Sequence, residues 1–163
     1  MKNRSKVVAT VSLPHPGRLL VIEELDYSNP YDFNALHRHD YFEIILVKSG
    51  EGEQLIDFST YSMGSEQVFS IYPGQVHLMR RNTTTGLLIQ FRKDIFEFMY
   101  PLKHHLLYTC SPVFDFSPDR NGNSFLPVVY SIFPKKIGKD GRTAFNFFCH
   151  CCAPDTSKHF GKL

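Results

Sequence analysis

Polar side chains that could share one site occur at regular spacing in the first half of the chain. Every second position from 37 to 43 carries one of them: His37, His39, Tyr41 and Glu43. Alternate residues of a β-strand project from one face, so these side chains would converge. A third histidine, His77, follows a turn sequence farther along. Imidazole nitrogens and carboxylate oxygens can hydrogen-bond a small molecule or ligate a metal ion.

Short β-strands are the elements predicted to position these residues. From Arg18 to Phe91, apolar runs alternate with turn sequences containing Gly, Pro or Asn, which is typical of an all-β sandwich or barrel. The predicted strands are Leu19–Glu23, Tyr41–Lys48, Glu53–Phe58, Val68–Ile71, Gln75–Met79 and Leu87–Phe91. The run from Tyr41 to Lys48 is apolar on both faces, which predicts a central strand. One face would line the barrel interior.

The pattern changes after Phe91. Residues Asp94–Tyr100 and Ser124–Phe133 are predicted to be helices that end before prolines and pack against the barrel. The second helix carries enough apolar surface to predict a homodimer. Beyond residue 134, Gly and Pro interrupt any periodic pattern, so an irregular tail is expected.

Composition limits the classes of protein to which the chain can belong. Its 163 residues fit one domain, and 42% hydrophobic residues are enough for a packed core. A formal net charge of +2 does not predict a nucleic-acid-binding surface. No signal peptide or membrane span is predicted. The four cysteines do not form a disulfide framework, so we expect a cytoplasmic protein with no membrane partner.

The spacing of the polar residues resembles the two motifs of the cupin superfamily. The resemblance covers residues 35–80 in the pattern His37-x-His39-x3-Glu43-x6-Gly50, with Pro73-Gly74-x2-His77 downstream. It implies a mainly β fold, the double-stranded β-helix or jelly-roll barrel, here followed by C-terminal helices. In metal-binding cupins the corresponding residues are ligands, which would place a divalent metal on His37, His39, Glu43 and His77.

A closer resemblance is to the N-terminal, arabinose-binding-like cupin domain of AraC-type transcription regulators. It rests on the phrases HRHDYFEI (37–44), SGEG (49–52) and IYPGQVH (71–77). In those regulators the barrel binds a small effector, of which a sugar is the familiar example, and an adjoining helix mediates dimerisation. Most need no metal, so no cofactor is expected. The resemblance implies that the effector contacts His37, His39, Tyr41, Glu43 and His77.

The same resemblance suggests a division of the chain. Residues 1–17 would be an N-terminal arm, 18–100 the cupin barrel, 101–133 a helical dimerisation segment and 134–163 the irregular tail. Two helix-turn-helix units follow the sensor in AraC-type regulators, and 30 residues cannot hold them, so no direct DNA binding is expected. We hypothesise a change of reading frame between Phe133 and Arg142, which would make the chain the sensor part of a truncated regulator.

Three functions remain open from the sequence. The first, which we predict, is a non-enzymatic sensor in which an effector shifts the population of docking states of an arm or helix. The second is a metal-dependent cupin enzyme, an oxygenase or isomerase. The third is a dimerisation module whose barrel interior is packed core. The alternative to a metal site is that hydrogen bonds hold the polar side chains in a pocket without a metal. This applies to His37, His39, Glu43 and His77.

Overall fold

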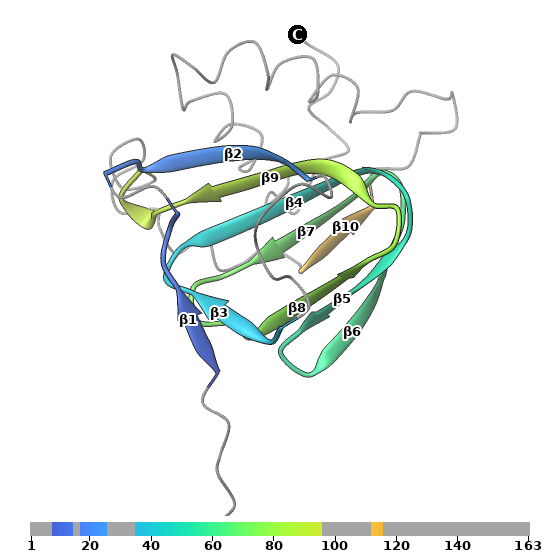
Figure 1. Ribbon diagram of the computed structural model, residues 1–163, viewed down its shortest axis with the longest axis horizontal. Helices are drawn as coiled ribbons and strands as arrows, with labels where there is room; N and C mark the ends of the chain where they lie inside the picture. Colours follow the sequence, from blue (N-terminus) through green and yellow to red (C-terminus); the bar gives the residue numbers. More distant parts are fainter. Residues whose placement is uncertain (1–7, 15–16, 26–34, 96–111, 116–163) are drawn as a thin grey trace, which may run out of the picture.

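Two facing β-sheets make up the part of the chain that the structure describes. The computed structural model describes residues 8–14, 17–25, 35–95 and 112–115, and in these ranges the chain forms ten strands in two five-stranded sheets (Figure 1). The predicted mainly β, double-stranded barrel is therefore confirmed. Within these residues no helix is long and apolar enough to cross a membrane.

The first sheet carries the three histidines. Its strand order is β1 (Ala9–Val11), β3 (His37–His39), β8 (His77–Arg81), β5 (Gly52–Ile56) and β6 (Ser59–Met63). β1 runs parallel to β3, and the other neighbours are antiparallel. β3 and β8 pair at His37 and His77, so the sheet itself places these two histidines side by side.

The second sheet carries the long apolar strand at its centre. Its order is β10 (Val113–Asp115), β7 (Gln67–Ile71), β4 (Phe42–Ser49), β9 (Thr85–Phe91) and β2 (Leu20–Leu25), all antiparallel. β4 has a partner on each side, and all residues from Phe42 to Val47 are buried. The prediction of a central strand covered on both faces is confirmed.

A hydrophobic core joins the two sheets. Ile45 and Val47 of β4 point into it, as the alternation predicted. The other buried members come from both sheets: Leu25, Ile56, Met63, Phe69, Ile71, Met79 and Leu88. Two of its members, Ile56 and Ile71, are the cross-strand neighbours of His77 and Glu43, so the core borders these polar residues directly.

Gly86 marks the closest approach of β4 and β9. It pairs with Val47, and the register then shifts before Ser49. A side chain at position 86 would collide with the carbonyl group of Leu46. Glycine is therefore required for these two strands to pair here.

The predicted strand Glu53–Phe58 ends two residues early. Asp57 has a positive φ of 53° and turns the chain into β6, a strand that the sequence analysis did not predict. The Asp57 carboxylate accepts hydrogen bonds from the backbone N–H of Val76 and the amide of Gln75. These contacts place Gln75 and Val76 in a turn, so β8 begins at His77 instead of Gln75.

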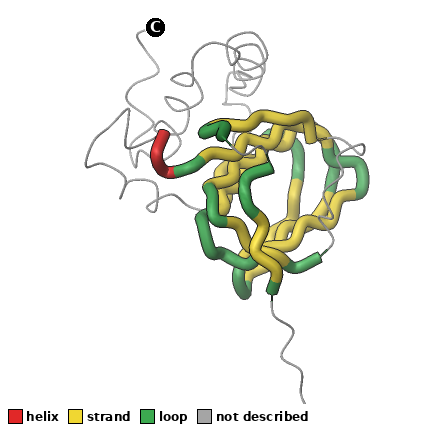
Figure 2. Tube along the Cα trace, turned by 60° about the vertical axis from the view of Figure 1, so that its left-hand side comes forward, coloured by secondary structure: helices red, strands yellow, loops and turns green. Residues whose placement is uncertain are grey.

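Two further strands lie in segments for which no strand was predicted. β1 belongs to the expected arm and joins the first sheet, whereas β10 belongs to the expected helical segment and joins the second. A helix begins at Lys93, one residue before the predicted start, and its described part ends at Ile95 (Figure 2). The remainder of that helix, the predicted helix 124–133 and the tail 134–163 lie outside the described residues.

Candidate functional site

The candidate site lies where the chain passes from one sheet to the other. β3 belongs to the first sheet and β4 to the second, and Asp40 and Tyr41 form the bend between them. The backbone N–H of Asp40 donates to Val11 and that of Gly74 to His39. Residues 37–43 are thus not one continuous strand. The polar side chains converge because the two sheets face each other, not because they share one strand face.

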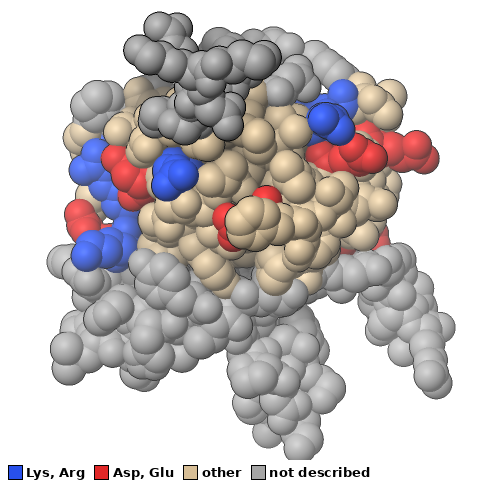
Figure 3. Space-filling view, turned by 90° about the horizontal axis from the view of Figure 1, so that it is seen from below, with Lys and Arg blue, Asp and Glu red and all other residues tan. Residues whose placement is uncertain are grey.

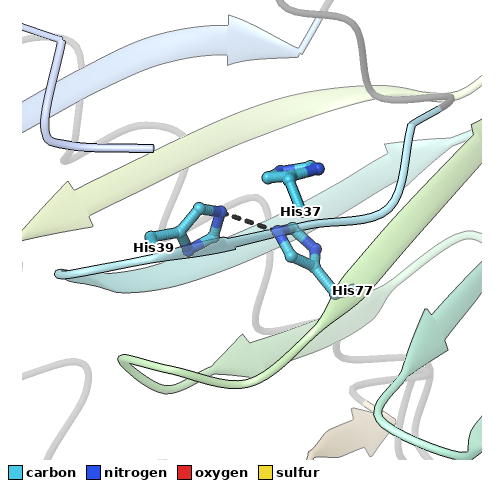
Figure 4. Close-up of side chains that lie close together, drawn as sticks. All are labelled: His37, His39 and His77. Atoms are coloured by element: carbon cyan, nitrogen blue, oxygen red, sulfur yellow. Dashed lines mark hydrogen bonds between the residues drawn. The ribbon is translucent and has the colours of Figure 1, made fainter. Parts of the chain in front are cut away.

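Three histidine rings meet at this crossing (Figure 4). The ring centroids of His37 and His77 are 4.2 Å apart, and the ring of His39 lies 4.4 Å from that of His77 and 5.2 Å from that of His37. One ligand nitrogen from each ring lies within 4.8 Å of the others. His39 and His77 are buried, and His37 is half-buried. The structure therefore brings together the three histidines that the sequence singled out.

Hydrogen bonds determine which ring nitrogens carry protons. His37 Nδ1 lies 2.8 Å from the carbonyl oxygen of Ala35 and must donate to it. The Gln54 amide nitrogen is 3.0 Å from His77 Nδ1 and donates to it. The proton of His77 is then on Nε2, which donates to His39 Nε2 at 2.6 Å. His39 consequently carries its own proton on Nδ1.

Burial keeps the two inner histidines neutral. Burial, together with a smaller effect of the nearby His37, lowers the pKa of His39 to about 3. The pKa of His77 is lowered to about 2, first by burial and then by His39 and His37. Neutral imidazole is the form that ligates metals and can both donate and accept hydrogen bonds. Both functions are therefore available at neutral pH.

Glu43 approaches the histidines from the second sheet. Its side chain is 1% exposed, and Oε2 lies 3.7 Å from His39 Nε2. Gln90, the cross-strand neighbour of Glu43 on β9, donates from Nε2 to Glu43 Oε2 at 2.8 Å and to the Tyr41 hydroxyl at 3.2 Å. Burial raises the pKa of Glu43 to about 7, although the hydrogen bond from Gln90 acts in the opposite direction.

The aromatic ring of Tyr41 is part of the same site. The ring stacks on that of His39, with 4.4 Å between centroids and 11° between planes. It also packs in a small apolar cluster with Leu13 and Val21. All five predicted site residues therefore lie at the same end of the barrel.

Sequence reasoning missed two glutamines of the site. Gln54 and Gln90 lie in β5 and β9, far from the histidine motif in sequence, and both are buried. Strand alternation could have identified them: Gln54 stands two residues before Ile56, and Gln90 two residues after Leu88, both of which point into the core.

Four buried polar atoms of the site have no hydrogen-bond partner among the described residues. They are Glu43 Oε1, Gln90 Oε1, Gln54 Oε1 and His39 Nδ1. Buried polar atoms are nearly always paired, and exceptions commonly mark a binding site or an ordered water. The polar end of the barrel is thus able to make more hydrogen bonds than the protein itself supplies.

Comparison with known families agrees with this geometry. Residues 22–92 match the family model described as AraC-like ligand binding domain. The matched segment covers 71 of the 163 residues, which is under half of the chain. It includes all five predicted site residues and both glutamines, whereas β1 and β10 of the two sheets lie outside the matched range. No curated protein matches the chain.

Several solved structures are similar to parts of the chain. A cupin protein from Bacteroides fragilis is 21% identical, with a TM-score of 0.34 over 45% of this chain and 64% of its own. A conserved protein of unknown function from Streptococcus pyogenes is 16% identical, with a TM-score of 0.37 over 51% and 80%. Oxalate decarboxylase from Bacillus subtilis is 12% identical, with a TM-score of 0.33 over 49% and 29%. The matches therefore cover less than two thirds of the length of the cupin protein and of the decarboxylase.

The residues of the AraC-like domain fit a divalent metal in their chemistry. His37 donates its Nδ1–H to a backbone carbonyl, as metal-bound histidines commonly do. A flip of the Gln54 amide would let its oxygen accept from His77 Nδ1–H in the same way. Glu43 stands beside His39 as a fourth, carboxylate ligand.

Proposed function

We propose that the AraC-like domain senses a small-molecule effector that binds at the polar end of the barrel interior. The observation that carries this proposal is the set of four buried polar atoms without partners, gathered on side chains of both sheets. An effector that pairs with them would be held by His37, His39, Tyr41, Glu43 and His77, together with Gln54 and Gln90. Sugars belong to the class of effectors to test because the resemblance to AraC-type regulators implies them.

The N-terminal strand is the element through which binding would be transmitted. β1 pairs with β3 in the register Ala9 to His37 and Val11 to His39, directly beside the site histidines. Leu13 then packs against Tyr41. An effector that contacts His39 and Tyr41 would change the affinity of this segment for the barrel, which shifts its docked population. We propose that this change is passed on in a homodimer.

The proposed role does not require this chain to contact DNA. On the face seen in Figure 3, the described Lys and Arg side chains lie beside Asp and Glu side chains instead of forming a continuous basic surface. A DNA-binding partner or domain would supply that contact. We propose the cytoplasm as the location of the protein.

Ligand-dependent thermal unfolding tests the proposal. The full chain, treated with a chelator, is screened against sugars, amines and aromatic acids. An effector at roughly tenfold its Kd is expected to raise Tm by about 3 °C. Gln90→Leu should weaken the response because it removes the amide that holds Glu43 and Tyr41. Glu53→Gln, at an exposed position, is the control and should leave it unchanged. The proposal is contradicted if no sugar, amine or aromatic acid changes Tm.

A metal-dependent oxygenase or isomerase is the second candidate, favoured by the close grouping of three histidine nitrogens. A divalent metal on these residues would supply a Lewis acid with positions for water, dioxygen or substrate. The chain's own contribution would be the neutral histidines and the Gln90-held carboxylate of Glu43. Metal analysis of the purified protein separates the two candidates: the enzyme requires a stoichiometric metal that His39→Gln removes and Glu53→Gln retains.

A further inference from the structure

Glu43 is a buried carboxyl group with no Lys or Arg partner among the described residues. Its side chain is 1% exposed, and its contacts are the amide of Gln90 and the ring of His39. Neither of these contacts involves a Lys or Arg side chain. Placing an ionised carboxylate in such surroundings is costly unless a positive charge accompanies it.

Protonation of Glu43 does not satisfy the group either. A proton on Oε1 would find no acceptor, because that atom has no hydrogen-bond partner. A proton on Oε2 would face the N–H of Gln90, which already donates to that oxygen at 2.8 Å. Among the described residues, Oε1 therefore has no hydrogen-bond partner, and Gln90 is the donor to Oε2.

The neighbouring glutamines add acceptors to the same end of the barrel. Gln90 must turn its nitrogen toward the carboxylate, so its Oε1 is left as a second free acceptor beside Glu43. Gln54 Oε1 is a third, whereas His39 Nδ1 is the one donor without a partner among these side chains of the site. Three free acceptors, one of them on a carboxylate, require a ligand that is rich in donors.

We propose that the effector of this site is a small organic cation bearing N–H groups: a protonated amine, an amidine or a guanidine. This inference rests on the proposed function and names the chemical class of its ligand. The positive group would bind Glu43, and its remaining N–H groups would donate to Gln90 Oε1.

Other classes of ligand fit these atoms less well. A neutral sugar supplies O–H donors, but it leaves the charge of Glu43 without compensation. A carboxylic acid would bring a second negative charge next to Glu43 and add acceptors where acceptors are already in excess. A cation with several N–H groups meets both requirements, because it supplies donors and positive charge together.

Isosteric pairs of probes test the inference on the full chain treated with a chelator. The pairs are benzamidine and benzamide, methylguanidine and methylurea, and butylamine and butanol, with arabinose and benzoate added. At least one cation is expected to raise Tm by about 3 °C at roughly tenfold its Kd, while its neutral partner has no effect. Glu43→Gln should abolish this shift, and Glu53→Gln, the same change at an exposed position, should retain it.

Gln90→Met provides a second variant that keeps the carboxylate. It removes the free acceptor Oε1 and should weaken binding of the same cation about tenfold, measured by calorimetry. If a neutral partner, arabinose or benzoate raises Tm and no cation does, the effector is not a cation. Effector sensing would then still stand. A cation effect that persists in Glu43→Gln would also overturn the inference of a cationic effector. No shift with any probe would count against both the inference and the proposed function.

Discussion

Replacing Glu43 by glutamine tests whether the buried carboxyl group is protonated in the folded protein. Burial raises the pKa of Glu43 from 4.5 to about 7. A carboxyl group with a raised folded pKa stabilises the fold fully below pH 4.5, and this contribution is lost as the pH rises through 7. The free energy of unfolding changes by about 1.4 kcal/mol per pH unit in that window. Between pH 5 and pH 8 the wild-type protein should therefore lose about 2 to 3 kcal/mol that Glu43→Gln keeps.

Urea unfolding of both proteins at four pH values from 5 to 8 measures this difference directly. Other titrating groups contribute equally to the two proteins, so they cancel when the two free energies are subtracted at each pH. The Glu53→Gln protein should remain parallel to the wild type, because Glu53 is exposed and pairs with Arg80 at the surface. Equal m-values are needed for the comparison.

The reasoning is refuted if the free energies of Glu43→Gln and the wild type differ by the same amount at pH 5 and pH 8. That result would mean that Glu43 is ionised in the folded protein across the range, and that something in the barrel already compensates its charge. The hydrogen bond from Gln90 would then outweigh the effect of burial.

Three further perturbations follow from the structure. His39 and His77 have folded pKa values of about 3 and about 2, so they stabilise the fold fully above pH 6.5 and lose this contribution as the pH falls. In urea unfolding below pH 6.5, His77→Gln should reduce the decrease of the free energy of unfolding by about 1.4 kcal/mol per pH unit. Gly86→Ala should prevent the folded circular dichroism spectrum from forming, because a side chain would collide with the Leu46 carbonyl. Phe58→Ser should change the free energy of unfolding by under about 0.5 kcal/mol, since this fully exposed side chain packs against nothing.

The sequence was sufficient for the barrel where hydrophobic alternation is strong. β4 was predicted within one residue at each end because it is buried on both faces and reads as an apolar run. β6 was missed for the opposite reason. It is an edge strand whose residues, STYSM, are mostly exposed, so burial leaves no pattern in its composition.

The site was predictable in its members but not in its geometry. Alternation correctly paired His37 with His39, but it was extended to Glu43 across a bend that local sequence does not reveal. The glutamines were missed because the sequence alone does not distinguish a buried glutamine in a strand from an exposed one. The cross-strand partner must be known first. Gln90 acquires its role only through the pairing of β9 with β4.

The pairing of β2 with β9 also governs how the chain can fold as it is synthesised. Residues 20–25 have their partner in residues 86–91, so a growing chain exposes this apolar strand until most of the barrel has left the ribosome. At typical rates of translation the delay is about 3 to 12 s. Local hairpins such as β5–β6 can form during that time, but the second sheet cannot close. The polar end of the barrel, which needs β9 to deliver Gln90, is therefore among the last parts to assemble, and an effector has no complete site to bind before then.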